Sequence, residues 1–116
     1  PTVLSTLDTL ADSYGKIGDN NNAMRCFNEI IKRLSKRDIN NQRSPKSSRA
    51  LAVIHYKMSR FHRKQNDLQA ALLALEKSLS FVDGIGGGGP ELLDRIKKEM
   101  NEVEVALDDD ANMNWI

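Results

Sequence analysis

Cysteine, aromatic residues and long apolar runs are scarce in this sequence, and each scarcity excludes a class of protein. Cys26 is the only cysteine, so neither an intrachain disulfide nor a multi-cysteine metal site is possible. Aromatic residues make up 5% of the 116 residues, which disfavours an aromatic-rich β-sandwich. No apolar run is long enough for a membrane span or a signal peptide. We therefore expect a single-domain protein of the cytoplasm or the nucleus, where cysteines stay reduced.

An excess of charge and the motifs of common enzymes are absent as well. Seventeen basic and sixteen acidic residues give a net charge of +1, which indicates no particular partner. The sequence lacks phosphate-binding loops, metalloprotease motifs and nucleophile elbows. His55 and His62 have no acidic or thiol partner at a ligand spacing, so we expect them to pack in the core or to face a groove. We expect a protein that is not an enzyme and that holds no cofactor and no metal.

What the sequence does contain is helical periodicity. Apolar residues recur every three or four positions in the ranges 3–17, 23–34, 51–62, 68–82 and 92–107. Short breaks at 18–22 and 65–67 join the first four ranges into two pairs, and a polar segment at 35–48 separates the pairs. The pattern predicts an all-α fold with two antiparallel helical hairpins and a C-terminal fifth helix.

Glycines divide the chain into parts. Residues 83–90 contain five glycines, four of them consecutive, and end in Pro90, which predicts a linker. The expected organisation is a hairpin pair over 1–82, the linker, a helix over 91–107 and an acidic, aromatic tail over 108–116. Two interpretations of the C-terminal part stay open. It is a closing helix that covers the apolar edge of the second hairpin, or a ligand segment tethered by the linker, which is natural or introduced by fusion.

The two hairpins are copies of one another at a constant offset in sequence, which we call the repeat offset. The first copy has Leu7, Leu10, Ala11, Tyr14, Gly18, Ala23 and Phe27, and the second has, in the same order, His55, Met58, Ser59, His62, Asn66, Ala71 and Leu75. This order of large, small and aromatic positions resembles the tetratricopeptide repeat, in which small residues lie where helices cross closely. The repeat offset exceeds the usual repeat of about 34 residues by about the length of the polar segment. In this respect the chain is loosely similar to kinesin-light-chain repeats.

The resemblance implies a protein–protein interaction module, an adaptor or scaffold, with a peptide groove lined by the first helix of each pair. Carried onto this sequence, the groove-facing positions are Ser5, Asp8, Asp12, Lys16, Val53, Tyr56, Arg60, Arg63 and Lys64. Residues 32–64 hold eleven basic residues and one acidic residue, so the second helix of the groove is basic. An acidic peptide with an aromatic anchor suits such a groove.

The C-terminal tail has the composition of such a peptide. Its acidic and large apolar residues are Asp108, Asp109, Asp110, Met113, Trp115 and Ile116. Acids steer a ligand and a large aromatic residue anchors it, so this segment is the first candidate ligand.

Two other functions compete with peptide binding. The first is a basic helical domain that binds nucleic acid through Arg43, Lys46, Arg49, Lys57, Arg60, Arg63 and Lys64. Few aromatic residues lie near these basic residues, which disfavours the stacking of nucleobases on the protein. The second is a structural dimer that exchanges its fifth helix through the glycine linker. We therefore expect a monomer or a dimer of this exchanged kind.

Overall fold

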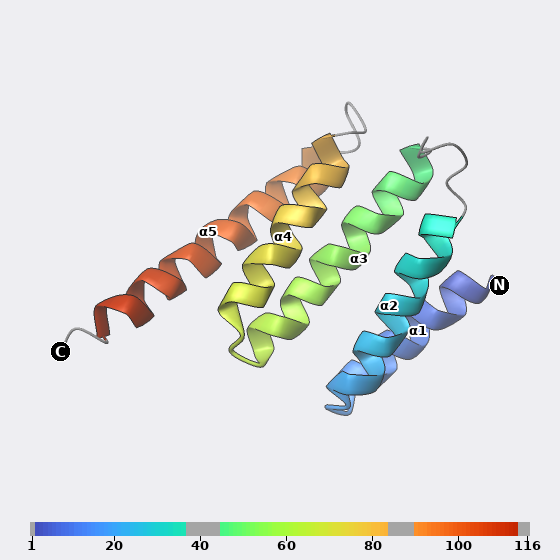
Figure 1. Cartoon of the computed structure of the whole chain (residues 1–116), viewed down its shortest axis with the longest axis horizontal. Coiled ribbons are helices and arrows are strands. Elements are labelled where there is room, and N and C mark those ends of the chain that lie inside the picture. Colours follow the sequence, from blue (N-terminus) through green and yellow to red (C-terminus); the bar gives the residue numbers. More distant parts are fainter. Residues whose placement is uncertain (1, 37–44, 84–89, 114–116) are drawn as a thin grey trace.

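The computed structural model describes residues 2–36, 45–83 and 90–113, which form five helices and no strand. The helices are α1 (Val3–Lys16), α2 (Asn20–Lys36), α3 (Pro45–Lys64), α4 (Leu68–Asp83) and α5 (Pro90–Met113). Helix α1 packs against α2, α3 against α4, and α5 against α4 (Figure 1). The predicted all-α fold, with two helical hairpins and a fifth helix, is confirmed. Most of the polar segment between the hairpins and most of the predicted glycine linker lie outside the described residues.

Both hairpin turns are built in the same way, at positions related by the repeat offset. Gly18 and Asn66 have left-handed φ values of 82° and 60°, which glycine and asparagine adopt at low cost. An aspartate follows in each turn, and the backbone N–H groups of Asp19 and Asp67 donate to the carbonyl five residues earlier, at 2.8 and 2.9 Å. The same two side chains cap the next helix, because each accepts from the N–H three residues later, at 3.3 and 3.2 Å. The sequence repeat is therefore also a repeat of backbone conformation.

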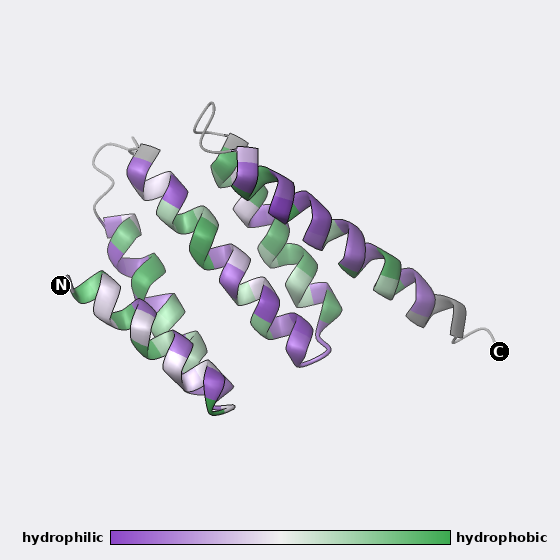
Figure 2. Cartoon of the chain, turned by 180° about the vertical axis from the view of Figure 1, so that it is seen from behind, coloured by the Kyte–Doolittle hydropathy of each residue, from purple (hydrophilic) through white to green (hydrophobic). Residues whose placement is uncertain are grey.

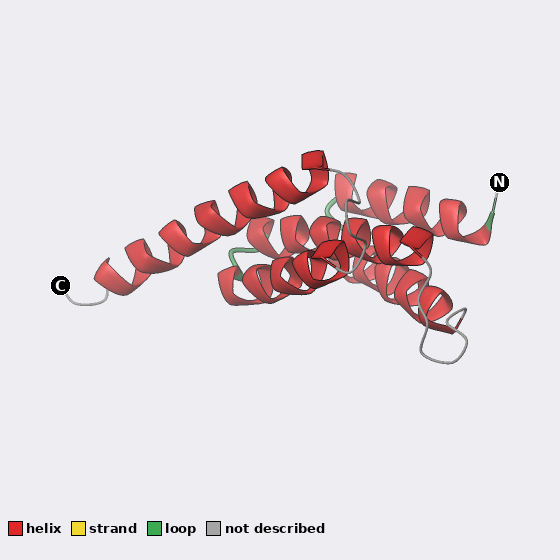
Figure 3. Cartoon of the chain, turned by 90° about the horizontal axis from the view of Figure 1, so that it is seen from above, coloured by secondary structure: helices red, strands yellow, loops and turns green. Residues whose placement is uncertain are grey.

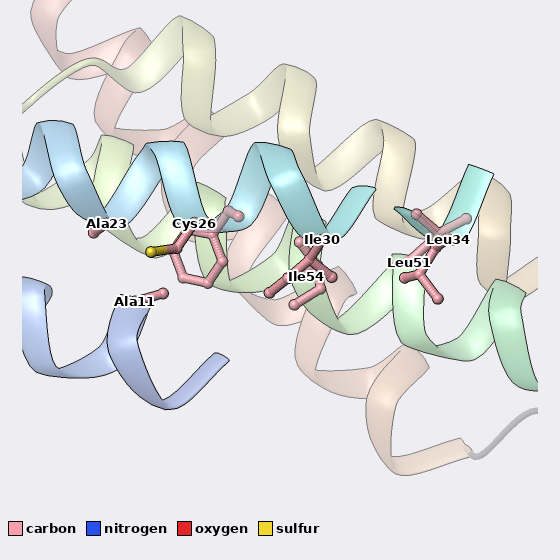
Figure 4. Close-up of a cluster of buried hydrophobic side chains, with 8 residues drawn as sticks. Ala11, Ala23, Cys26, Ile30, Leu34, Leu51 and Ile54 are labelled. Carbon is pink, nitrogen blue, oxygen red and sulfur yellow. The ribbon is translucent and has the colours of Figure 1, made fainter. Parts of the chain in front are cut away.

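The small residues of the repeat lie where helices meet. Ala11, Ala23, Ser59 and Ala71 are all buried, with at most 1% of their surface exposed. The Ser59 hydroxyl donates to the carbonyl of Tyr56, so burial leaves it paired. Figure 4 shows Ala11 of α1 facing Ala23 of α2 inside a cluster that joins α1, α2 and α3. The small residues of both copies are therefore buried, as residues at close helix contacts must be.

Helix α5 covers the edge of the second hairpin. Ile96 and Val103 are fully buried in a second cluster, which joins α3, α4 and α5. This is the packing expected of a closing helix. The helix continues beyond the predicted end at Leu107 as far as Met113, because no glycine or proline interrupts this stretch. Residues 108–113, which were expected to form part of a tail, are therefore the last turns of α5.

Helices α1, α3 and α5 form one face of the molecule. Seen from behind, α1 and α5 lie in front of their partners α2 and α4, and α3 lies between them (Figure 2). The view from above shows α5 extending past the second hairpin (Figure 3). The positions predicted to line a groove belong to two helices of this face, α1 and α3.

The contact of the Phe61 ring of α3 with the α1 backbone depends on Gly15. A Cβ placed on Gly15 would lie 2.6 Å from Cε1 of Phe61, far inside van der Waals contact. We expect Gly15→Ala to lower the free energy of unfolding by ~1 kcal/mol. Overpacking costs about 1–3 kcal/mol, and the better helix propensity of alanine returns up to about 1 kcal/mol.

Urea denaturation measures this loss, and Phe61→Leu supplies the control background. Leucine removes the ring atoms that would meet the new methyl group, so Gly15→Ala should be neutral or stabilising there. An equal loss in both backgrounds would contradict the contact.

Candidate functional site

A cavity of about 300 Å³ lies between the C-terminal halves of α1 and α3. We call it the cationic pocket, and its lining residues are Asp12, Gly15, Lys16, Lys57, Arg60, Phe61 and Lys64. Four of these side chains are basic and one is acidic. Because Gly15 has no side chain, the Phe61 ring lies against the α1 backbone and forms an apolar wall. The structure therefore brings together the predicted groove residues Asp12, Lys16, Arg60 and Lys64.

The two aspartates predicted to face a ligand are held by a lysine of the same chain. Lys57 Nζ donates to Asp8 Oδ1 at 2.8 Å and lies 3.6 Å from Asp12 Oδ2. This bridge ties α1 to α3 and neutralises much of the acidic character of α1. Lys57 was absent from the predicted groove row, although its spacing from Val53 and Arg60 puts it on the same face of α3. The aspartates thus serve the contact between hairpins and are not free to hold a ligand.

Three cations of the pocket have no such partner. Lys16, Arg60 and Lys64 are exposed and form no salt bridge within the described part of the chain. The Lys64 ammonium lies 5.9 Å from the centroid of the Phe61 ring, a cation–π distance. Lys16 and Lys64 also end their helices, where a cation interacts favourably with the helix dipole. The helix dipole explains why each helix ends in a lysine. It does not explain why both lysines and Arg60 line the same cavity.

Arg63, a predicted groove residue, is directed to α5 instead. Its Nη1 donates to Glu102 Oε2 at 2.8 Å and to Glu99 Oε1 at 3.0 Å. The hydrogen bonds to Glu102 and Glu99 raise the pKa of Arg63, and the bond from Arg63 lowers the pKa of Glu102. The spacing within α3 could not reveal this pairing, because both carboxylates come from a helix more than thirty residues away. Arg63 therefore holds α5 against α3.

The other predicted groove residues occupy three different settings. Tyr56 is half-buried and packs against the second cluster, on the side of α3 that faces α4 and α5. Ser5 completes the N-terminal capping box of α1 by exchanging hydrogen bonds with Thr2 at 3.1 Å. Val53 lines a separate hollow nearer the N-terminus of α3. The Tyr56 side chain therefore packs against the second cluster and does not line the cationic pocket.

The candidate ligand segment lies at the far end of α5. Asp108 and Asp109 are exposed on the helix surface, and the C-terminal end of α5 points away from α1 and α2 (Figure 1). The side chains of Asp110 and Met113, and the whole of Trp115 and Ile116, lie outside the described residues. The buried contacts of Ile96 and Val103 hold α5 to α4, so this helix does not occupy the α1–α3 groove of its own chain.

The histidines and the cysteine take structural places. His55 is buried and stacks on Phe81, with ring centroids 5.5 Å apart. Burial, and next the charge of Lys77, lower the pKa of His55 to about 4. His62 is half-buried at the end of α3, and Cys26 is buried with a free thiol. Among the residues described, no three histidine, cysteine, aspartate or glutamate side chains gather as a metal site would require.

No helix in the described ranges has the length and apolar character to cross a membrane. Comparisons with known proteins place the chain in no family: no family model, no curated protein and no solved structure is significantly similar to it.

Proposed function

We propose that this chain is a protein–protein interaction module of tetratricopeptide type, with no catalytic role, that binds an acidic peptide in the cationic pocket. The carrying observation is the convergence of Lys16, Arg60 and Lys64 on one cavity, beside an aromatic wall and without carboxylate partners. Two other basic side chains of α3 are paired, Lys57 with Asp8 and Arg63 with Glu102. An acidic ligand would supply the partners that the three cations lack.

The family part of the proposal is supported by the repeat. Small residues are buried at equivalent positions of the two copies, and both hairpin turns use the same backbone hydrogen bonds. The binding part of the proposal is supported by the charges of the pocket. Charge-assisted hydrogen bonds from lysine and arginine to carboxylates are roughly twice as strong as neutral ones. The single cysteine is buried and free, in keeping with the intracellular location that we propose.

Nucleic-acid binding is the competing function, and one observation favours it. Five basic residues share one face of α3, and each of them lines one of the two cavities beside α1. They are Lys46, Arg49, Lys57, Arg60 and Lys64. Such a row could follow phosphates. Phe61 is the only aromatic ring that lines those cavities, and it lies against Gly15, which leaves little surface for base stacking. Peptide binding therefore accounts for more of the site.

Reversal of one charge tests the proposal. A labelled synthetic peptide with the sequence of residues 108–116 is titrated into the full chain, and affinity is read from fluorescence anisotropy. We expect Arg60→Glu to weaken binding about tenfold, because it replaces a charge-assisted hydrogen bond by repulsion. Arg25→Glu changes the net charge equally on α2, at an exposed site, and should change the affinity less than about twofold.

The controls separate the two functions. Raising the salt concentration from about 50 to about 200 mM should weaken peptide binding, because the pocket charges are exposed. Equal losses for Arg60→Glu and Arg25→Glu would refute a local site. A single-stranded oligonucleotide that binds as tightly as the peptide, with a steep salt dependence, would favour nucleic acid.

A further inference from the structure

A second hollow of about 430 Å³ lies on the same α1–α3 groove, toward the N-termini of both helices. Its apolar lining residues are Leu4, Ile30, Leu34, Ala50, Val53 and Ile54. We propose that this hollow, the anchor hollow, receives the large apolar side chain of the peptide whose acidic residues occupy the cationic pocket. The inference rests on the proposed function and adds to it the position of the anchor and its spacing from the acids.

The anchor hollow has a buried floor and an open apolar wall. Ile30, Leu34 and Ile54 are at most 5% exposed and belong to the first core cluster. Leu4 and Val53 are half-buried, so each presents part of its surface to the hollow. A large apolar side chain seated here would cover surface that the chain leaves in contact with water.

The rim determines which kind of partner fits. Lys46 and Arg49 are exposed and line the hollow. Its single acidic lining residue, Asp8, is already paired with Lys57. A ligand that carries negative charge next to its anchor is attracted by this rim, and a basic ligand is repelled. The chemistry is therefore that of an acidic peptide with one aromatic or large aliphatic residue. Nucleic acid offers the charge but no comparable aliphatic or indole anchor.

The separation of the two sites sets the spacing in the ligand. Arg60 and Lys64 lie seven and eleven residues after Val53 on α3, which corresponds to roughly 10–16 Å along the helix. An extended peptide covers this in roughly three to five residues. The ligand should thus carry its apolar anchor three to five residues from a carboxylate. The segment 108–116 meets this condition, because Asp110 and Trp115 are five residues apart.

Filling the hollow tests this inference in the full chain. Two peptides serve as probes, the sequence of residues 108–116 and the same peptide with Trp115→Ala. With the unmodified chain, the alanine peptide should bind about tenfold more weakly, the loss expected for a buried aromatic anchor. Val53→Phe fills the hollow, so it should weaken binding of the Trp peptide about tenfold and reduce the difference between the two peptides to less than about twofold.

Val105→Phe is the matched control, since Val105 is an exposed valine on α5. It should leave both affinities unchanged. Val53→Ser enlarges and polarises the hollow without adding bulk, so it should also reduce the difference between the peptides. Thermal unfolding of each variant shows that the fold is retained. A third peptide of the same composition, with the tryptophan directly after the third aspartate, should bind about as weakly as the alanine peptide.

The outcomes separate the two levels of the proposal. If Arg60→Glu weakens binding but Val53→Phe and Val53→Ser affect both peptides equally, the anchor lies elsewhere and only this inference falls. If the rearranged peptide binds as well as the original, the spacing is wrong. If no peptide binds in a salt-dependent way, the proposed function falls together with the inference.

Discussion

Phe27→Ala should lower the free energy of unfolding by about 4 kcal/mol, the largest effect that we expect from any single truncation in the chain. The Phe27 side chain is fully buried at the centre of the first cluster, and truncation of a buried phenylalanine costs about 3–5 kcal/mol. Its ring meets Phe61 edge to face, with centroids 5.3 Å apart, so an aromatic contact is lost as well. Since natural domains are stable by about 5–15 kcal/mol, much of the margin disappears.

Urea or thermal denaturation followed by circular dichroism measures this loss. Leu73→Ala is the control, because Leu73 is 60% exposed on α4 and its truncation should change stability by less than about 0.5 kcal/mol. Phe27 also supports the aromatic wall of the cationic pocket through Phe61. A Phe27→Leu variant that stays folded should therefore weaken peptide binding, and unaltered binding would separate this contact from the site. Equal losses for Phe27→Ala and Leu73→Ala would show that Phe27 is not at the centre of the core.

Stability should fall as the solution is acidified, and His55 should account for about 3 kcal/mol of this fall. Burial and the nearby charge of Lys77 lower the pKa of His55 from 6.5 to about 4 in the folded chain. Between these two values the unfolded chain takes up the proton and the folded chain does not. The contribution of His55 is therefore fully present above about pH 6.5 and is lost progressively as the pH falls toward 4.

The comparison that isolates this effect is His55→Leu, because the first copy of the repeat has Leu7 at the equivalent position. Free energies of unfolding are measured between about pH 4 and pH 7 for both proteins. The difference between them should shift by about 3 kcal/mol in favour of the leucine variant at the acid end. Carboxylate titration affects both proteins alike and cancels. Parallel curves of unfolding free energy against pH would show that the pKa of His55 is not lowered in the folded chain.

The residues that line the cationic pocket were predictable where a helix face alone determines exposure. Lys16, Arg60 and Lys64 lie in the cationic pocket as the groove positions require, since residues three and four apart share one face. The same rule failed for Tyr56 and Arg63. These two residues share a different face of α3, which helix α5 and the second cluster cover. A helical wheel of α3 alone cannot show which of its faces are covered by neighbouring helices.

The pairing of charges was not predictable at all. Asp8 and Asp12 look like a ligand-binding pair in the sequence, but the register of α1 against α3 brings Lys57 between them. Lys57 and Asp8 are 49 residues apart in the sequence. A small rotation or shift of either helix would remove the contact. The anchor hollow arises in the same way, from the gap left where α1, α2 and α3 meet.

The sequence by itself determined the helices, their turns and the repeat of one hairpin in the other, because these depend on local physics. Apolar spacing produces an amphipathic helix, and Gly18 and Asn66 accept the left-handed conformation that a turn needs. Only the tertiary structure decided which charges are paired and where two hollows open beside α1 and α3. Those features depend on the relative register of whole helices, which is set by the packing of side chains distant in the sequence.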